Sequence, residues 1–296
     1  MKAANDTPRL SIGMPVHNGE RYVETALRSL LQQRFQDYEL IVSNNGSTDA
    51  TKQIVERVMR HDPRARLVNH QALMRPEENF LYCLSQARGQ YFMWAAHDDK
   101  WHPAFTERLV EALDLHPKVA LAFATYQHMN EADEPLGDPI DLDYSGRTVY
   151  ERLCRFSWTY RDTCTYGIFR RSVMEGIQFP RWRWMNRDIP TNTAYPILYR
   201  VLAQGDFALV RGEPLWYYRT HTGHAHARSA HPGRPVLNFA AFAVRKANVA
   251  IESLRYVYRG SGSAGLSLAV WPILQARCAY DTLAELKRGV ALRLVR

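Results

Sequence analysis

Residues 10–49 read LSIGMPVHNGERYVETALRSLLQQRFQDYELIVSNNGSTD, and their pattern decides the fold. A short apolar run from Leu10 to Val16 is followed by apolar residues at helical spacing between Glu20 and Gln33. A second strand-like run then covers Glu39 to Val42. A strand, a helix and a strand at this spacing predict a β-α-β unit, in which the two strands lie parallel.

The same alternation continues to about residue 125. Further apolar runs predict strands at 66–68, 91–95 and 119–124. Apolar residues at helical spacing predict helices at 54–59, 77–87 and 103–116. Strands that are apolar throughout are typical of parallel sheets covered on both faces. We therefore predict an α/β fold with a Rossmann-like, mostly parallel sheet flanked by helices.

The remainder of the chain is less regular. A Gly-, Ala-, Ser- and His-rich connection over 221–235 contains four histidines, but no cysteine accompanies them, so a solvated loop is favoured over a zinc site. Two helical segments follow it. We divide the chain into a first half, 1–125, a second half of the same domain, 126–235, and a helical C-terminal extension, 236–296.

Composition narrows the class of protein. The 296 residues carry a formal net charge of +8, which suits an anionic partner such as a nucleotide diphosphate or an acidic lipid headgroup, or serves solubility alone. The four cysteines form no C-x-x-C pair, and this favours reduced thiols in the cytoplasm. The N-terminus lacks the pattern of a secretory signal, and the longest apolar stretch, 264–276, is too short to span a bilayer.

The strongest chemical signal is a pair of adjacent carboxylates, Asp98 and Asp99, directly after the apolar strand at 91–95. Buried like charges repel, so such a pair requires a cation or hydrogen bonds. A hard divalent ion bridging to phosphate oxygens would supply that compensation. The alternative is that one carboxylate caps the helix that follows.

Two further polar segments follow predicted strands. Residues 43–49, SNNGSTD, are suited to reading a base or ribose edge, but a plain turn with a helix cap is the alternative. Residues 15–20, PVHNGE, place His17 where it would stack on a nucleobase or serve only in a turn. Ligands of such sheets lie beyond the carboxyl ends of the strands, so these loops are expected to meet the acidic pair. No G-x-G-x-x-G or P-loop motif is present.

Together, these segments resemble the family 2 glycosyltransferases, which have the GT-A fold. The resemblance covers about residues 9–99 at regular spacing and continues more loosely to about 221. It rests on co-occurrence, in order, of the following segments: PVHNGE at 15–20, QRF at 33–35, ELIVSNNGSTD at 39–49, NF at 79–80, ARG at 87–89, and the aromatic strand with its acidic pair at 91–99.

The resemblance implies a nucleotide-sugar donor site in residues 1–125 and an acceptor side in 126–235. Pro15, His17 and Asn45 would line the nucleoside pocket, with Asp98 facing the ribose or the metal. Asp99 would ligate Mn²⁺ or Mg²⁺, and His221 is either a further metal ligand or a loop histidine. Family members often have an aspartate where this chain has Asn44-Asn45, so the preference for a uridine diphosphate sugar is weak.

The reaction implied is inverting sugar transfer to the hydroxyl of a glycan or lipid-linked acceptor. Its catalytic base is less defined, because the family position falls near Ala194 by gap-free counting. Asp188 is the nearest acid, ahead of Asp162 and Glu175. Two alternatives stay open, namely a non-catalytic nucleotide-sugar-binding subunit and a sugar-phosphate nucleotidyltransferase, although the latter would require a glycine-rich phosphate loop.

The C-terminal helices carry several basic residues, among them Arg245, Lys246, Arg255 and Arg259. They predict either a basic amphipathic surface resting on the inner face of the cell membrane or helices that pack on the catalytic domain or in a homodimer. A nucleic-acid partner is not expected.

Overall fold

The computed structural model describes residues 7–159, 161–180, 183–184, 187–188, 194–221 and 235–294, without the side chains of 183–188, 235–241 and 286–294. The chain forms two compact units. The first, here called the sheet unit, comprises Met1–Asp143, Thr163–Gly176 and Asp206–His221. The second, the helical unit, comprises Tyr144–Asp162, Ile177–Gly205 and Thr222–Arg296. The stretch 126–235 therefore contributes to both units.

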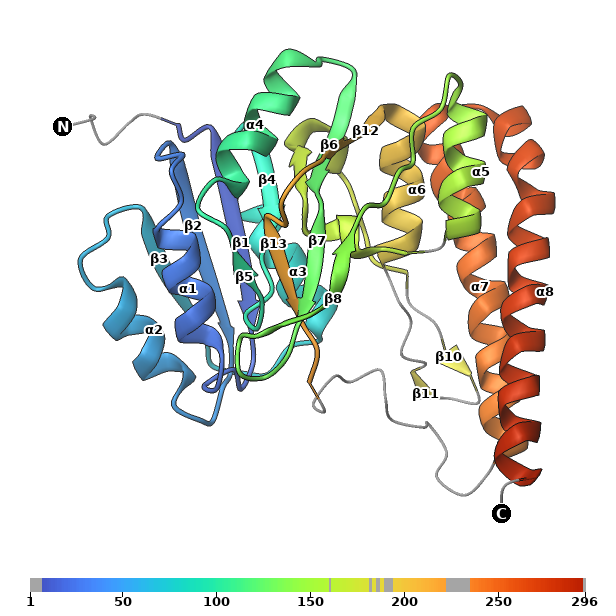
Figure 1. Cartoon of the computed structure of the whole chain (residues 1–296), viewed down its shortest axis with the longest axis horizontal. Helices are drawn as coiled ribbons and strands as arrows, with labels where there is room; N and C mark the ends of the chain where they lie inside the picture. Colours follow the sequence, from blue (N-terminus) through green and yellow to red (C-terminus); the bar gives the residue numbers. More distant parts are fainter. Residues whose placement is uncertain are drawn as a thin grey trace. The chain divides into compact units, whose positions relative to one another are not determined.

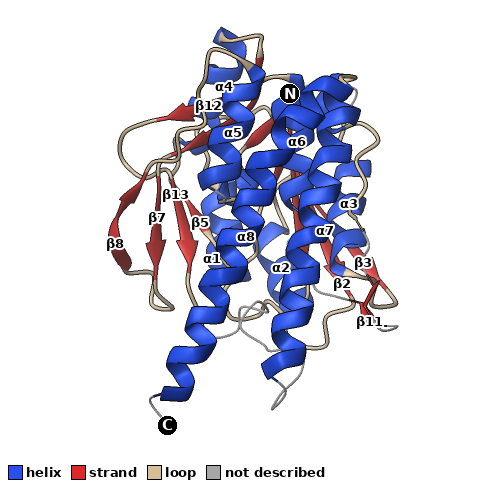
Figure 2. Ribbon diagram, turned by 90° about the vertical axis from the view of Figure 1, so that its right-hand side faces the viewer, coloured by secondary structure: helices blue, strands red, loops and turns tan. Residues whose placement is uncertain are grey.

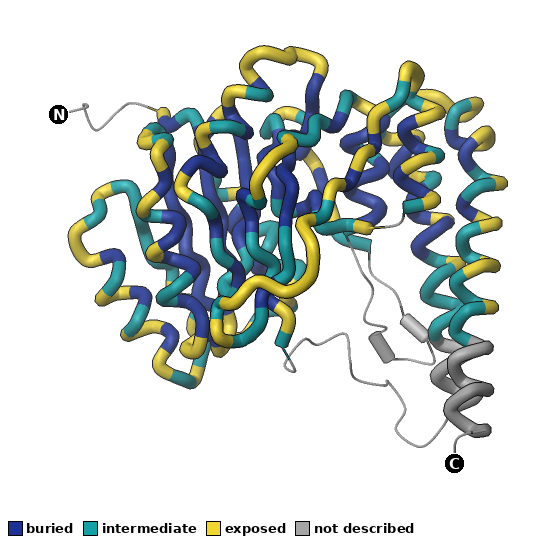
Figure 3. Tube along the Cα trace, in the orientation of Figure 1, coloured by how far each residue is buried: buried dark blue, intermediate teal, exposed yellow. Residues whose placement is uncertain are grey.

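A seven-stranded sheet forms the centre of the sheet unit, in the order β12-β6-β9-β4-β1-β2-β3 (Figure 1). Its strands are β1 (Leu10–Val16), β2 (Tyr38–Asn45), β3 (Ala65–His70), β4 (Tyr91–Trp94), β6 (Val119–Ala124), β9 (Ile168–Arg170) and β12 (Asp206–Val210). Only β9 runs antiparallel to its neighbours, β4 and β6. Every residue of β1, β2, β4 and β6 is buried (Figure 3). The predicted mostly parallel α/β sheet is confirmed.

Four helices flank this sheet: α1 (Val23–Leu31), α2 (Thr51–Met59), α3 (Pro76–Ser85) and α4 (Phe105–Leu115). The chain steps from β1 to β2 to β3 in one direction and then returns to β4 on the other side of β1. Because parallel crossovers are right-handed, this reversal places α3 on the opposite face from α1 and α2. The reversal also opens the sheet edge between the loops that follow β1, β2 and β4, where ligands bind in such folds.

A smaller four-stranded sheet brings a distant segment to the end of β4. Its order is β5-β13-β7-β8, with bounds β5 (Lys100–Trp101), β13 (Trp216–Arg219), β7 (Tyr126–Met129) and β8 (Pro135–Ile140). Trp216 lies opposite Trp101, and Tyr217 lies opposite Lys100. Residues 216–221 are thereby placed beside the acidic pair. Two short 3-10 helices, η1 (Thr163–Tyr166) and η2 (Arg171–Met174), flank β9.

The helical unit consists mainly of four helices: α5 (Val149–Thr159), α6 (Ala194–Gln204), α7 (Pro235–Ser261) and α8 (Ala264–Leu294) (Figure 2). It also contains a two-stranded ribbon of β10 (Arg183–Trp184) and β11 (Arg187–Asp188). Gly262, with φ of +68°, ends α7 and allows the chain to turn into α8. The predicted helical C-terminal extension is confirmed. None of the described helices combines the length and the apolar character that crossing a membrane requires.

Candidate functional site

The loops that follow β1 and β2 are held together by reciprocal hydrogen bonds. The Asn18 side chain accepts from the Thr48 amide at 2.9 Å, and the Asn18 amide donates to the Ser47 hydroxyl at 2.9 Å. The Glu20 amide donates to Asp49 at 3.1 Å. Asn18 adopts φ of +50°, a conformation that asparagine tolerates better than most residues. These bonds make the two strand-end loops one rigid edge.

Asn45, a predicted base contact, uses its side chain inside the protein. Its amide nitrogen donates to the Met74 carbonyl at 2.9 Å, and its oxygen accepts from the Met74 amide at 2.8 Å. Its backbone carbonyl lies 2.8 Å from Nδ1 of His17, whose ring is exposed. Pro15 is buried within β1. Of these three predicted donor-binding residues, His17 is therefore the one that presents its side chain to solvent.

We predict that Asn45→Ala destabilises the fold by about 1–3 kcal/mol, because both polar groups of Met74 lose their partner. Thermal melting will measure the loss. If the side chain instead reads the base, the variant will keep its melting temperature and change the preference between uridine and guanosine nucleotides.

His97, which has no assigned role in the sequence prediction, joins the first loop to the acidic pair. A Cβ added at Gly19 would lie 2.5 Å from Cδ2 of His97, so the loop packs directly on this ring. Burial lowers the pKa of His97, and the imidazole is therefore neutral at pH 7. Any side chain at position 19 would clash with the His97 ring and with Val16, so the ring or the loop would have to shift.

Asp99 lies inside the protein rather than at a surface. Only 1% of the residue is exposed. One carboxylate oxygen accepts from Trp216 Nε1 at 3.0 Å, and the other accepts from the Arg219 amide at 2.9 Å. Burial, and secondly the neighbouring Asp98 carboxylate, raise the pKa of Asp99 well above its usual value. The structure thus shows Asp99 joining β4 to β13 through hydrogen bonds, which is a different environment from the metal ligand that the sequence predicts.

We predict that Asp99→Asn lowers stability by about 1–3 kcal/mol, because its new NH₂ group must face one of two N–H donors. Thermal melting of the variant checks this. A variant that melts like the native protein would show that these two hydrogen bonds do not hold β13.

Asp98 points the other way, toward His221. Its Oδ2 lies 2.9 Å from Nε2 of His221, and the two side chains are 14% and 16% exposed. The His221 ring also lies against Tyr22, with 5.3 Å between ring centroids. A carboxylate oxygen and an imidazole nitrogen are both ligands that Mn²⁺ accepts, and here both are partly exposed to solvent. Two protein ligands leave the coordination shell of Mn²⁺ or Mg²⁺ incomplete, and phosphate oxygens would complete it.

Arg219 is the buried residue that fixes this arrangement, and the sequence analysis missed it. Its side chain is fully buried and donates to the Asp98 carbonyl at 2.6 Å, to the Asn130 carbonyl at 2.8 Å, and to the Asp133 carboxylate. The guanidinium lies 4.4 Å from the centroid of the Tyr22 ring. Tyr22 at the start of α1 and residues of the loops that follow β4 and β7 thus converge on this one cation of β13. The only sequence signal was an arginine two residues before His221.

The structure therefore brings together His17, Asp98 and His221 at one end of the sheet unit. Asp188 lies in β11, and its side chain is outside the described part of the chain. Among the described residues, no group of three or more His, Cys, Asp and Glu side chains is placed to hold a metal ion. Among the described side chains, Asp98 and His221 are the pair that could bind a cation here.

Comparison with known proteins assigns this architecture. Residues 11–178 match the model of the glycosyl transferase family 2. The chain is 31% identical over 113 residues to the glycosyltransferase EpsE of Bacillus subtilis, covering 38% of this chain and 41% of EpsE. It is 33% identical over 174 residues to GalNAc(5)-diNAcBac-PP-undecaprenol beta-1,3-glucosyltransferase of Campylobacter jejuni, covering 58% of this chain and 55% of that protein. The chain thus spans about half the length of these curated relatives.

Solved structures agree on the fold. Residues 1–349 of S. aureus TarS in complex with UDP-GlcNAc align with a TM-score of 0.63 and 18% identity, over 96% of this chain and 83% of that chain. The mannosyltransferase PcManGT of Pyrobaculum calidifontis, in complex with GDP-Man and Mn²⁺, aligns with a TM-score of 0.54 and 16% identity, over 98% and 81%. With its α/β sheet, its paired strand-end loops and its family match, the chain belongs to glycosyltransferase family 2 and has the GT-A fold.

Proposed function

We propose that this chain is an inverting glycosyltransferase that moves a sugar from a nucleotide-diphosphate donor, with UDP-sugars favoured, to the hydroxyl of a glycan or lipid-linked acceptor. The observation that carries the proposal is the Asp98–His221 pair, 2.9 Å apart, beside the loops that follow β1 and β2. The complex of TarS with UDP-GlcNAc and the undecaprenol-linked substrate in the Campylobacter relative's name support the donor and acceptor classes.

In this proposal Asp98 and His221, rather than Asp99, hold Mn²⁺ or Mg²⁺. Asp98 is reachable from solvent, whereas both oxygens of Asp99 accept hydrogen bonds from buried N–H groups. A divalent cation bound there offsets the charge of the departing nucleoside diphosphate. The Mn²⁺ in the PcManGT complex supports the choice of metal. Arg219 keeps Asp98 in place through its backbone carbonyl, and Asp99 holds β13 so that His221 reaches the site.

The donor's nucleoside would lie along the edge formed by the loops after β1 and β2. His17 is exposed and offers its ring for stacking, and the hydrogen bonds of Asn45 to the Met74 backbone would hold the neighbouring loop in place. Direct displacement then requires one general base to take the proton of the acceptor hydroxyl. Asp188 remains our proposed base, since it is the acid nearest to the family position in sequence.

A panel of nucleotide sugars, each tested by thermal shift with and without Mn²⁺, tests the donor class. Ligands that bind only the folded state raise the melting temperature, so we expect the largest shift with UDP-sugars plus Mn²⁺. Release of UDP from the stabilising donor is then expected in the presence of Mn²⁺ and not after chelation with EDTA.

Assays of nucleotide release and of pyrophosphate formation separate sugar transfer from the two alternative functions. A binding subunit would be stabilised but would release no nucleotide. A sugar-phosphate nucleotidyltransferase would form pyrophosphate from UTP and a sugar phosphate. Either result would refute sugar transfer.

A further inference from the structure

The two units carry opposite charge. The helical unit contains 19 Lys and Arg residues and 6 Asp and Glu residues, a net charge of +13. The sheet unit contains 19 and 24, a net charge of −5. The net positive charge of the whole chain therefore comes entirely from the helical unit. Such an asymmetry indicates an anionic partner for the helical unit.

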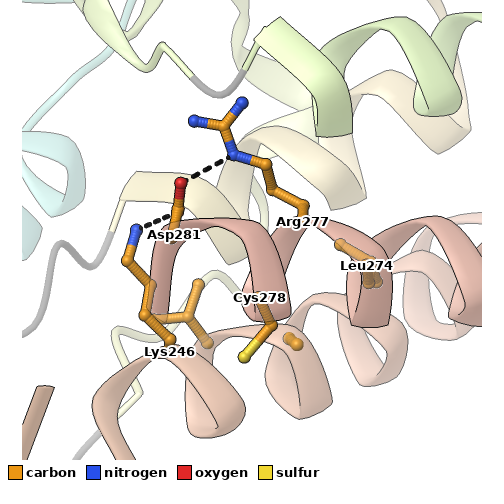
Figure 4. Close-up of a pocket in the computed structure, with 7 residues that line it drawn as sticks. Lys246, Leu274, Arg277, Cys278 and Asp281 are labelled. Carbon is orange, nitrogen blue, oxygen red and sulfur yellow. Dashed lines mark hydrogen bonds and ion pairs between the residues drawn. The ribbon is translucent and has the colours of Figure 1, made fainter. Parts of the chain in front are cut away.

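Not all of its basic residues are available to a partner. Lys246 of α7 lies 2.6 Å from Asp281 of α8, which also pairs with Arg277 at 3.0 Å (Figure 4). The pocket among these side chains has a volume of only about 10 Å³, which is about the room that one water molecule requires. The sequence predicted that Lys246 belongs to a basic surface. In the structure its ion pair with Asp281 instead joins α7 to α8.

The outward face of α8 lacks the charges usual on a surface helix. Between Ala264 and Glu285, no exposed residue of α8 is charged. Leu268, Tyr280 and Leu283 are 71%, 57% and 58% exposed, whereas Val270 and Leu274 on the opposite side are buried. A helix of a water-soluble unit normally turns charged residues to solvent. The exposed side of α8 over this stretch is therefore uncharged and carries large apolar side chains, so it is suited to an apolar partner.

Exposed arginines lie next to this face at the closed end of the α7–α8 hairpin. An open groove of about 480 Å³ is lined there by Leu254, Arg255, Tyr258, Arg259, Ser267 and Leu268. The Arg255 side chain pairs with Glu252 at 2.5 Å but is still 64% exposed, and Tyr258 is 52% exposed. Arginines beside an apolar groove form an amphipathic surface. Such a surface is complementary to a partner that carries anionic groups at the edge of an apolar region.

We propose that this groove, together with the outward face of α8, docks the protein on an anionic lipid bilayer. Arg255 and Arg259 contact the headgroups, Tyr258 lies at the interface, and Leu268 enters the acyl region. Nucleic acid would leave the uncharged face of α8 without a partner. In a dimer formed through this face, two helical units that each carry a net charge of +13 would face each other and repel. The proposal goes beyond sugar transfer and does not depend on it.

Flotation of the full-length chain with vesicles tests the docking surface. We expect binding to phosphatidylcholine vesicles that contain phosphatidylglycerol, little binding to phosphatidylcholine alone, and weakening as salt rises. Arg255→Glu/Arg259→Glu should reduce binding at least about tenfold, since each basic residue near the surface contributes about 1 kcal/mol. Tyr258→Ser/Leu268→Ser should reduce binding even at low salt. The matched control, Lys52→Glu/Arg60→Glu, changes one residue in α2 and the residue that follows this helix. It makes the same charge change on the sheet unit and should bind as the native chain does.

Three outcomes would overturn the proposal. One is equal binding of all variants, or binding that requires no anionic lipid. Another is a dimer in solution that both groove variants convert to a monomer, which would make the face a contact between copies. The third is binding to RNA or heparin that Arg255→Glu/Arg259→Glu abolishes while lipid binding is absent, which would make the charge a polyanion site. Thermal melting serves as the folding check, because it reports whether each groove variant is folded without relying on the proposed sugar transfer.

Discussion

Asp98→Asn is expected to lower sugar transfer by about 10³-fold while leaving the melting temperature nearly unchanged. Removal of the carboxylate charge weakens the cation that offsets the leaving diphosphate, an effect of several kcal/mol at about 1.4 kcal/mol per tenfold in rate. The Asp98 side chain is partly exposed, and asparagine can keep its hydrogen bond to His221, so the fold loses little. Steady-state kinetics with saturating Mn²⁺ measures the change.

His221→Asn is the companion to this variant. It removes the second ligand but keeps a hydrogen-bonding group of similar size, so a smaller loss, partly restored by raising the Mn²⁺ concentration, is expected. Transfer by Asp98→Asn at the native rate would exclude Asp98 as the metal-binding carboxylate.

Arg219→Met is expected to give the largest loss of stability, about 3–5 kcal/mol, because it breaks a buried charge network by removing one partner. The Asp98 carbonyl loses the Arg219 donor, and the Asn130 carbonyl is left with the Asp133 amide at 3.3 Å. Among the described residues, the Asp133 carboxylate keeps an ion pair with Lys100, at 3.8 Å. The melting temperature should fall by roughly 6–20 °C for a chain of this size. Transfer should also fall, since Asp98 loses its anchor.

Arg21→Met provides a matched control for this variant. Arg21 lies over the same Tyr22 ring, at 5.0 Å, and pairs with Glu131, but its side chain is 62% exposed. An exposed ion pair contributes at most about 1 kcal/mol, so the control should melt close to the native protein. Equal effects of the two substitutions would show that burial of Arg219 is not what stabilises the site.

The sheet could be predicted from local pattern because each strand is a separate apolar run. The parallel order of β1 and β2 follows from one helix between two strands, and the meeting of the loops at 17–20 and 44–49 follows from that order. The α/β fold, its flanking helices and the C-terminal helices are therefore all confirmed. Helix α5 was not predicted, and its path depends on packing within the helical unit.

The roles of Asp98 and Asp99 could not be separated by local pattern. Adjacent residues that leave a strand point in different directions, but sequence alone does not show which faces the interior. The deciding partners, Trp216 and Arg219, lie more than a hundred residues away and reach Asp99 through β13. The Asn45 clamp on Met74 likewise depends on a loop conformation that has no local signature. Asp188 stays a prediction.

The charge difference between the two units could not be predicted from the sequence for a different reason. A net charge of +8 looks moderate for the chain as a whole. It resolves into +13 and −5 only when three separated stretches are grouped by the contacts of the fold. The division of the chain into the consecutive stretches 1–125, 126–235 and 236–296 could not reveal this grouping.

Titration calorimetry of UDP with and without Mn²⁺, on the native chain and on Asp98→Asn, tests the central claim most directly. If Asp98 holds the cation that binds the diphosphate, Mn²⁺ should raise the UDP affinity of the native chain by at least about tenfold, or 1.4 kcal/mol, and leave that of Asp98→Asn unchanged. An equal gain with Mn²⁺ in both proteins would contradict the account.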